Sequence, residues 1–346
     1  MTGRRKRNAD ADSRNVTIRD VAREAGVSVA TVSRAFAAPD RVREETREKI
    51  FAVSRRQHFV VNAVARSLAS RRSGLIGLVI PSIYNSIYAA STQAIQAAAE
   101  AQGYTVLIGV SEFDNAREAE LIGQFAARRV EGLILTGADR ARSAVELIRR
   151  ERLPFVVTWH SARGRGAASV SFDNAAAAAS VVDYLHGLGH RRIALICGRT
   201  ALNDRALARK EGFLKRMGER GLPCSPEDVI ECDFEFEAGR TALRALLARQ
   251  PRPTAIFSAN DIVAVGALHE CRQQGLRVPE DISLVGFDDL PIAQYVTPQL
   301  TTVRVPAAAM GEHAVALLMR AISGEASRSE TLETELIVRG SAATHA

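Results

Sequence analysis

Apolar residues follow two different spacings along this chain. Between residues 17 and 57 they recur every three to four positions, which is the spacing of one buried helix face. From Leu75 onward they gather into short runs that alternate with amphipathic stretches. The pattern therefore predicts a small helical region followed by a larger domain of alternating strands and helices.

The helical region begins with a helix-turn-helix pattern in residues 17–36. Thr17 can cap a first helix, and Asp20 suits the first turn of that helix. Gly26 supplies a left-handed residue that ends the helix, and Ser28 can cap a second one. The residues expected to pack this motif are Ile18, Val21, Ala22, Ala25, Val27, Ala30, Val32 and Ser33. A helix-turn-helix places its second helix in the DNA major groove, although two ordinary helices joined by a glycine turn are the alternative.

Two further helical segments follow this motif. A third helix is predicted over residues 43–57, with Ile50 and Val53 facing the first two helices. Residues 62–69 form a helical stretch that is too short to be stable alone in water. We expect that stretch to order only when something packs on it, and residues 1–15 to be disordered.

The larger domain is predicted to hold at least nine strands, nearly all separated by helices. The strands are expected at residues 75–80, 105–110, 132–136, 155–158, 168–172, 192–197, 229–232, 254–258 and 282–286. The helices include residues 92–102, 118–128, 175–188, 210–220 and 238–249. Continuous apolar strands joined by helices form parallel sheets that are covered on both faces. So many strands exceed one small sheet, so we predict two doubly wound lobes with a ligand cleft at the carboxyl ends of the strands.

Positive charge is concentrated at the N-terminal end. The 346 residues carry a formal net charge of +7, and residues 1–72 hold 17 Lys or Arg against 8 Asp or Glu. The rest of the chain therefore has a net charge of −2, and a localised basic region attracts polyanions such as DNA. A solubilising tail is the alternative for Arg4, Arg5, Lys6 and Arg7. That alternative suits the arginines that punctuate the predicted helices less well, namely Arg34, Arg55, Arg66, Arg71 and Arg72.

Composition narrows the class of protein further. Hydrophobic residues make up 47% of the chain, which is enough for a large globular core. Cys197, Cys224, Cys232 and Cys271 form no CxxC pair, and we expect three of the four to be buried free thiols. The sequence has no signal-peptide pattern and no run of about 18 apolar residues, so we expect a cytoplasmic protein.

Several longer segments carry a family resemblance. They are TIRDVAREAGVSVATVSR at 17–34, EETREKI at 44–50, NAVARSLA at 62–69, LIGLVIPSIYN at 75–85, GLGHRRIALI at 187–196, SANDIVAVGAL at 258–268 and GLRVPEDISLVGFDDLPIAQYVTPQLTTV at 275–303. Over about residues 16–340, and in the same order, the chain resembles the lactose-repressor (LacI) family of bacterial transcription factors. Several independent motifs agree, so the match is specific.

The resemblance implies a dimeric DNA-binding regulator and a division of the chain. An N-terminal all-α helix-turn-helix headpiece with a hinge helix would precede an α/β core of two doubly wound parallel-sheet lobes. This core resembles periplasmic binding proteins, whose lobes are joined by three chain crossings. The expected parts are a basic tail at 1–15, the helix-turn-helix domain at 16–61, the hinge at 62–73, the effector-binding and dimerisation core at 74–340 and a tail at 341–346. Lobe one would take about 74–172 and 307–331, and lobe two about 173–303 and 332–339.

By position in the motif, the second helix presents Val29, Ala30 and Arg34 to DNA. The two apolar side chains can meet a thymine methyl group, and the arginine can reach a guanine edge or a phosphate. Phosphate contacts are expected from Thr17, Ser28, Thr31, Ser33 and Asn62. For Thr31 and Ser33, helix packing is an equal alternative.

The hinge would act in the minor groove. In the family, the leucine that matches Leu68 wedges between base pairs at the operator centre, beside the alanine that matches Ala65. The alternative for Leu68 is packing against its dimer mate. Residues 57–62 read QHFVVN, where the family usually has a Gly-Tyr pair and a proline, so we expect a less rigid entry into the hinge helix.

A small-molecule effector would bind in the cleft between the lobes. Its contacts are expected at Asn85, Tyr88, Trp159, Arg205, Arg209, Phe234, Asn260 and Asp288, with Asp261 beside them. Trp159 stands where the family often has an aspartate, and it is either a stacking platform or a core residue of the hinge between lobes. Amide, carboxylate and aromatic groups suit a sugar, and losing one carboxylate while keeping the arginines favours a sugar acid slightly.

An enzyme and a solute-binding protein for transport are the rival interpretations. The sequence lacks the nucleophile-elbow, zinc-protease and P-loop patterns and any metal-spaced His/Cys cluster, so we expect no catalysis, no metal and no cofactor. A transport protein could share the core fold, but the expected absence of a signal peptide and the presence of a DNA-binding region oppose that interpretation.

Overall fold

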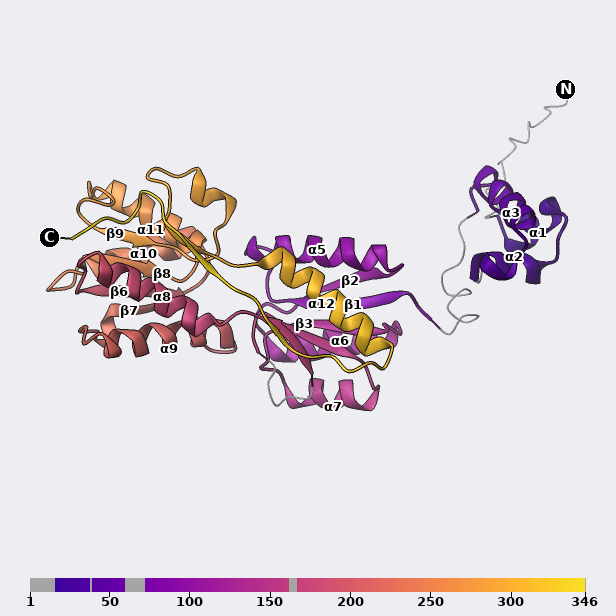
Figure 1. Cartoon of the computed structure of the whole chain (residues 1–346), viewed down its shortest axis with the longest axis horizontal. Coiled ribbons are helices and arrows are strands. Elements are labelled where there is room, and N and C mark those ends of the chain that lie inside the picture. The colour runs from indigo at the N-terminus through magenta and orange to yellow at the C-terminus, as the bar shows by residue number, and fades with distance from the viewer. Residues whose placement is uncertain (1–15, 38, 60–71, 162–166, 346) are drawn as a thin grey trace, which may run out of the picture. The chain divides into compact units, whose positions relative to one another are not determined.

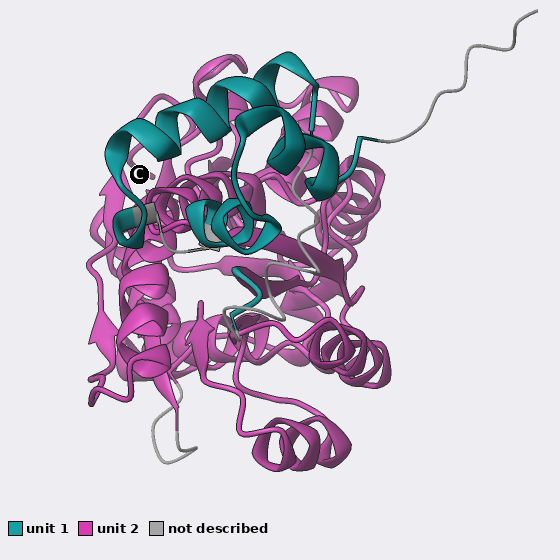
Figure 2. Ribbon diagram, turned by 90° about the vertical axis from the view of Figure 1, so that its right-hand side faces the viewer, with its two compact units in different colours: residues 1–74 teal, residues 75–346 magenta. Residues whose placement is uncertain are grey.

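Two units divide the chain, residues 1–74 and residues 75–346, and Figure 2 colours them separately. The structure is a computed structural model that describes residues 16–37, 39–59, 72–161 and 167–345. The predicted tail at 1–15 and most of the predicted hinge, including Asn62, Ala65 and Leu68, lie outside the described residues.

The N-terminal unit contains the three helices that the spacing of apolar residues predicts. They are α1 (Ile18–Ala25), α2 (Val29–Ala37) and α3 (Glu44–Arg56), with a 3-10 turn at Pro39–Arg41. The Asp20 carboxylate accepts hydrogen bonds from the Thr17 N–H and hydroxyl at 3.0 and 2.6 Å, which closes the start of α1. Gly26 ends α1 with a φ of 68°, and the Ser28 hydroxyl accepts from the Thr31 N–H at 3.1 Å to cap α2. The buried core that joins the helices is Val21, Ala22, Ala25, Val32, Ala35, Ile50 and Val53.

A six-stranded parallel sheet forms lobe one of the C-terminal unit (Figure 1). Its spatial order is β11 (Glu330–Thr331), β5 (Ala168–Ser171), β4 (Phe155–Thr158), β3 (Gly132–Thr136), β1 (Leu75–Ile80) and β2 (Thr105–Val110). Helices α5 (Ile87–Ala101) and α12 (Ala307–Ile322) cover one face, and α6 (Asn115–Ala127) and α7 (Arg142–Arg150) cover the other. Burial on both faces explains the apolar runs of the central strands β1, β3 and β4.

Lobe two repeats the same architecture with four parallel strands. Their order is β7 (Val229–Cys232), β6 (Ile193–Gly198), β8 (Ala255–Ser258) and β9 (Ser283–Val285). Helices α8 (Asn174–Gly187) and α9 (Asp204–Glu219) cover one face, and α10 (Phe236–Leu247) and α11 (Asp261–Gln273) cover the other. Two 3-10 turns, Pro226–Asp228 and Pro291–Gln294, complete this lobe.

The chain passes between the lobes three times, as the resemblance implies. The crossings follow β5, β10 (Thr302–Arg304) and β11, and the last leads into β12 (Glu335–Ile337). Strands β10 and β12 pair antiparallel, so two of the crossing segments are hydrogen-bonded to each other. The predicted fold class is therefore confirmed, and all nine predicted strands are present within one or two residues of their expected bounds.

Helix starts differ most from the prediction. The helix expected at 210–220 begins at Asp204, and the one expected at 92–102 begins at Ile87. The first turn of α9 is marked by a cap rather than by apolar spacing, because the Asn203 side chain accepts from the Ala206 N–H at 3.2 Å. A search for apolar periodicity does not detect such polar first turns.

Residues 340–345 contact lobe two through hydrogen bonds and a ring contact. The Ser341 carbonyl accepts from the Leu284 N–H at 2.7 Å, and the Ser341 hydroxyl donates to the Leu284 carbonyl. The His345 ring stacks on His190 with 5.2 Å between ring centroids. Burial lowers the pKa of His190 to about 4, so this contact is made by a neutral ring at neutral pH. Residues 340–345 are thus part of the lobe-two surface.

Helices α10 and α11 meet through glycines, which gives a first prediction. A Cβ at Gly266 would lie 2.0 Å from the Phe236 carbonyl oxygen, and one at Gly239 would lie 2.2 Å from the Val263 carbonyl oxygen. Gly266→Ala is therefore expected to lower the free energy of unfolding by about 1–3 kcal/mol in urea titrations. Gly218→Ala on α9 is the control, since its Cβ meets nothing within 4 Å and should stabilise the protein by about 0.5–1 kcal/mol. Equal effects of both changes would contradict the glycine contact.

Candidate functional site

A small cavity lies where the carboxyl ends of strands from both lobes meet. Its lining comes from the segments after β1 and β4 in lobe one and from β6, α9, β7, β8 and β9 in lobe two. The lining residues are Asn85, Ile87, Tyr88, Trp159, Gly198, Asn203, Arg205, Ala206, Arg209, Phe234, Ala259 and Asp288. The cavity volume is about 10 Å³, which is room for about one water molecule. Seven of the eight effector residues predicted from the sequence therefore lie around one cavity, and Asn260 is the exception.

Arg209 and Asp288 are the charged centre of this cavity. The Arg209 guanidinium donates to the Asn174 side-chain oxygen at 2.9 Å and to the Ala259 carbonyl at 2.8 Å. Its Nη1 lies 3.9 Å from Asp288 Oδ1, and its plane lies over the Phe287 ring at 4.2 Å. Burial raises the pKa of Asp288 to about 7, although Arg209 opposes that shift. The cavity thus holds an arginine with unused donors and a carboxyl group that titrates near neutral pH.

Asn260 acts behind the cavity wall. Its amide nitrogen donates to Asp288 Oδ2 at 2.7 Å, and its amide oxygen accepts from the Ile262 N–H at 2.9 Å to cap α11. The next residue, Asp261, accepts from the Thr302 hydroxyl and the Leu290 N–H, each at 2.7 Å. Burial raises the pKa of Asp261 as well. These two residues orient the strand-end loop that carries Asp288 and make no direct contribution to the lining.

Trp159 contributes to both the cavity and the core. Its side chain is 2% exposed, and its ring lies 5.1 Å from Tyr88 and 6.3 Å from Phe172, measured between centroids. Its backbone carbonyl accepts from the Asn174 amide at 3.0 Å. The ring therefore lines the cavity, and its position is fixed by packing against Tyr88 and Phe172.

The two lobes also touch directly beside the cavity. The Asp204 carboxylate at the start of α9 accepts from the Ala138 N–H at 2.6 Å and from the Asp139 N–H at 3.3 Å. Arg205 donates to the same carboxylate at 2.7 Å. The pKa of Asp204 is lowered, because Arg205 and these N–H groups outweigh the effect of burial. A Cβ at Gly137 would lie 2.1 Å from Arg205, so this close approach needs glycine.

A wider pocket opens next to the cavity. Its volume is about 660 Å³, and it shares Asn85, Asn203 and Phe234 with the inner cavity. Phe113 of lobe one faces Phe234 of lobe two with 6.1 Å between ring centroids. The other lining residues are Ser82, Tyr84, Glu112, Arg199, Ala201, Cys232, Asp233, Glu235, Phe236 and Ile262. Both parts of the cleft therefore combine polar groups with aromatic rings.

Backbone strain gathers at the same strand ends. Glu112, Phe113, Trp159 and Asp288 all have positive φ angles, of 54°, 59°, 71° and 114° respectively. Such conformations are costly for residues other than glycine, and they cluster at ligand clamps and other functional sites. This distribution marks the cleft independently of the side chains that line it.

Sequence reasoning missed Asn174, Asn203, Asp204 and Phe113. The first three lie at the starts of α8 and α9, where they look like ordinary helix caps. Phe113 follows β2, so the rule that ligands bind beyond the carboxyl ends of parallel strands could have identified it.

The exposed face of α2 forms a second candidate site, in the N-terminal unit. Val29 is 40% exposed, and Ala30 and Arg34 are exposed beside it. Thr17 and Ser28 are exposed at the helix starts, whereas Thr31 and Ser33 are partly buried. The Ser28 and Thr31 hydroxyls lie 2.8 Å apart, so at least these two share a local hydrogen bond. An apolar and cationic face on the second helix of this motif suits entry into a DNA major groove.

Two further classes of site are not seen in the described residues. No group of three or more His, Cys, Asp or Glu side chains there could hold a metal ion. No helix in the same part of the chain is long and apolar enough to cross a bilayer.

Comparison with known proteins finds relatives along almost the whole chain. The family described as "Bacterial regulatory proteins, lacI family" matches residues 17–62, and "Periplasmic binding protein-like domain" matches residues 182–342. The HTH-type transcriptional repressor CytR of Escherichia coli (strain K12) is 33% identical over 327 residues, which cover 94% of this chain and 96% of CytR.

Solved structures agree with the sequence relatives. A lac repressor dimer bound to operator and the anti-inducer ONPF is 28% identical with a TM-score of 0.85, covering 95% of this chain and 100% of that one. The transcriptional regulator CelR in complex with cellobiose is 29% identical with a TM-score of 0.70, covering 94% of this chain and 99% of CelR.

Proposed function

The chain belongs to the LacI family of bacterial regulatory proteins, and we propose that it is a repressor whose operator affinity is set by a sugar or sugar acid in the cleft. As a member of that family it is a DNA-binding transcriptional regulator and not an enzyme. Family regulators bind operator DNA and small-molecule effectors, and both classes of partner therefore apply to this chain.

The buried Arg209–Asp288 pair carries the effector proposal. A charged pair beside Asn85 and Tyr88 offers both donors and acceptors to the hydroxyl groups of a sugar ring. Arg205 also lines the cavity, but its guanidinium pairs with Asp204 at 2.7 Å, so Arg209 is the cation that favours a ligand with a carboxylate. The solved relative CelR is itself in complex with cellobiose, which supports a carbohydrate as the starting class.

We propose the eight cleft residues named from the sequence as the effector site and the α2 face as the operator site. In this proposal Asn85, Tyr88, Trp159, Arg205, Arg209, Phe234 and Asp288 contact the ligand, and Asn260 orients Asp288. Val29, Ala30 and Arg34 would contact bases, and the remaining polar residues of the predicted set would contact phosphates. Cytoplasmic placement follows as part of the same proposal, since the operator lies there.

We also propose a homodimer. The solved lac repressor relative is a dimer, and large apolar side chains are exposed on the core of this chain, including Ile83 at 65%, Tyr84 at 90% and Tyr295 at 85%. Sedimentation should report a dimer, and a stable monomer or tetramer would contradict this part of the proposal.

Two measurements test the proposed function. Selection from a random duplex library with the full chain should recover one operator sequence bound far more tightly than random DNA. A thermal-shift screen of sugars, sugar acids and purines should then raise Tm with a member of the first two classes, and that compound should change operator binding. Failure to select any sequence would refute the regulator, and a shift with purines alone would refute the ligand class.

Asp288→Asn provides a specific prediction for the effector site. The change keeps the shape of the side chain but removes a charged acceptor, so we expect effector affinity to fall about tenfold or more. Titrating the effector against operator binding measures this loss directly. Glu280→Gln, at an exposed position of lobe two, is the control and should leave the titration unchanged. If the variant and the wild type respond equally to the effector in this titration, Asp288 does not contact the effector.

A further inference from the structure

Arginines gather at the edge of lobe one that is opposite the effector cleft. All strands of its sheet are parallel, so their amino ends share one edge and their carboxyl ends share the other. The turns that lead into the amino ends of β3 and β4 follow helices α6 and α7. We call the arginines of these two turns and of the end of α7 the basic edge; they are Arg128, Arg129, Arg149, Arg150 and Arg152.

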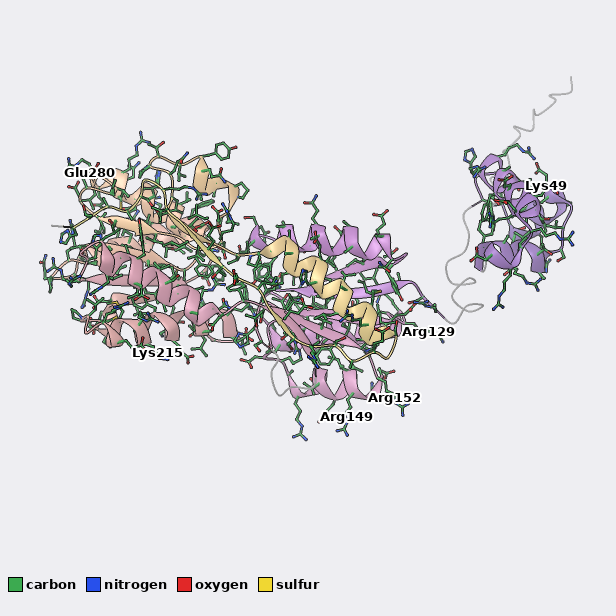
Figure 3. The ribbon with its side chains drawn as sticks, viewed as in Figure 1. Lys49, Arg129, Arg149, Arg152, Lys215 and Glu280 are labelled. Atoms are coloured by element: carbon green, nitrogen blue, oxygen red, sulfur yellow. The ribbon has the colours of Figure 1, made fainter. Side chains whose placement is uncertain are left out.

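The basic edge is exposed and only weakly neutralised. All five arginines are exposed, and Figure 3 labels Arg129, Arg149 and Arg152 at one end of lobe one. In the described part of the chain, these three labelled arginines form no ion pair, whereas Arg150 pairs with Glu151 at 3.0 Å. Most other arginines in the described part of the core have carboxylate partners, so three unpaired arginines at one edge of a sheet concentrate positive charge there.

Other charged residues at this edge do not reverse its sign. Glu131 accepts a hydrogen bond from the Tyr104 hydroxyl at 3.0 Å. Glu100 lies at the end of α5, and Glu325 lies just after the end of α12. The end of α12 also brings Arg320 and Arg328. The edge therefore remains positive, although the chain after residue 72 has a net charge of −2.

The chain enters lobe one at this same edge. Strand β1 begins at Leu75, whose carbonyl accepts from the Glu131 N–H at 2.8 Å in the turn before β3. Fifteen residues separate Phe59 of the helical unit from Leu75, and at full extension they span roughly 50–60 Å. The segment that links the helix-turn-helix to lobe one therefore joins lobe one at the basic edge.

We propose that the basic edge binds the phosphate backbone of operator DNA as a second, sequence-independent contact. The proposal rests on the proposed regulator function, because the helix-turn-helix must first bring the DNA near. Exposed guanidinium groups without carboxylate partners pair readily with phosphates, and each such contact releases counterions. The edge would add affinity and salt dependence, while base recognition stays with α2.

The test is the salt dependence of operator binding by the full chain. The variant Arg129→Asn/Arg149→Gln/Arg152→Asn removes the three unpaired cations, and Asn is chosen at 129 and 152 because both residues have φ above 50°. On the operator duplex recovered by selection, we expect the slope of log K against log salt to become shallower by about 2–3 for each bound chain, which is about 5 for the proposed dimer. Affinity at about 0.05 M salt should fall at least tenfold, with the preference for operator over random duplex retained.

A control variant removes the same charge elsewhere. Lys215→Gln/Arg191→Gln/Arg272→Gln changes three exposed cations of lobe two and should leave the slope unaltered. An unchanged slope for the basic-edge variant, or an equal change in both variants, would overturn the proposal. So would a basic-edge variant that binds DNA normally but loses regulation in a reporter strain, since that result indicates an acidic protein partner. If the wild type selects no operator, the regulator function itself fails, which is a distinct outcome.

Discussion

Arg209→Met is expected to destabilise the protein by about 3–5 kcal/mol at pH 8 and by clearly less at pH 6. At pH 8 the wild-type Asp288 is mostly ionised, because burial raises its pKa only to about 7 while Arg209 holds it down. Removing the arginine leaves a buried carboxylate without its cation, and breaking such a pair has a cost of this order. At pH 6 the carboxyl group already carries a proton, so only the hydrogen bonds and the contact with Phe287 are lost.

The sign of the pH dependence follows from proton binding. A folded-state pKa above the unfolded value means that the folded protein holds more protons, so stability falls as pH rises through this window. In the wild type, the loss of stability ends near pH 7. In the variant it continues to higher pH, because the pKa of Asp288 rises further. The difference between the two proteins should therefore grow above pH 7 by up to about 1.4 kcal/mol per pH unit.

Urea unfolding at pH 6, 7 and 8 measures this difference. The double variant Arg209→Met/Asp288→Asn is the control, because it lacks the Asp288 carboxyl group and should lose the dependence on pH that this group adds. A destabilisation by Arg209→Met that is equal at all three pH values would show that Asp288 does not depend on this arginine. Loss of effector binding in the same variant is expected at every pH, since Arg209 lines the cavity.

The strands were predictable because their environment is uniform. Strands such as β1 and β3 are buried on both faces, so nearly every residue in them is apolar and the run itself marks the element. The start of α9 was harder to predict, because a polar first turn interrupts the apolar spacing there. Local pattern therefore identified the elements, and cap chemistry decided where the helices begin.

The cleft was predictable only in part. Residues such as Asn85 and Asp288 follow strand ends, and parallel sheets bring such positions together. Asn260 also follows a strand, but its amide is used for capping α11 and for holding Asp288. The contact of Asp204 with the Ala138 and Asp139 N–H groups joins segments more than 60 residues apart, and no local pattern encodes that pairing.

Leu68→Ala is expected to weaken operator binding about a hundredfold while affinity for random duplex DNA changes little. Leu68 lies outside the described residues, and in the family that the chain resembles the matching leucine wedges into the minor groove. An alanine is too short to hold a base step apart, and the bend that the wedge stabilises would be lost. The basic surface that attracts any DNA sequence would remain.

Titrations of operator and random duplex at one salt concentration, with a gel assay of DNA bending, measure this loss. Leu214→Ala, which shortens a leucine that is 39% exposed on α9, is the matched control and should alter neither. Equal weakening on both DNAs would refute the wedge. The slope of log K against log salt should be unchanged in Leu68→Ala and become shallower in the basic-edge variant. The preference for operator over random duplex should be lost in Leu68→Ala and retained in the basic-edge variant. Sequence preference and phosphate attraction would then belong to different parts of this chain, and each could be altered without the other.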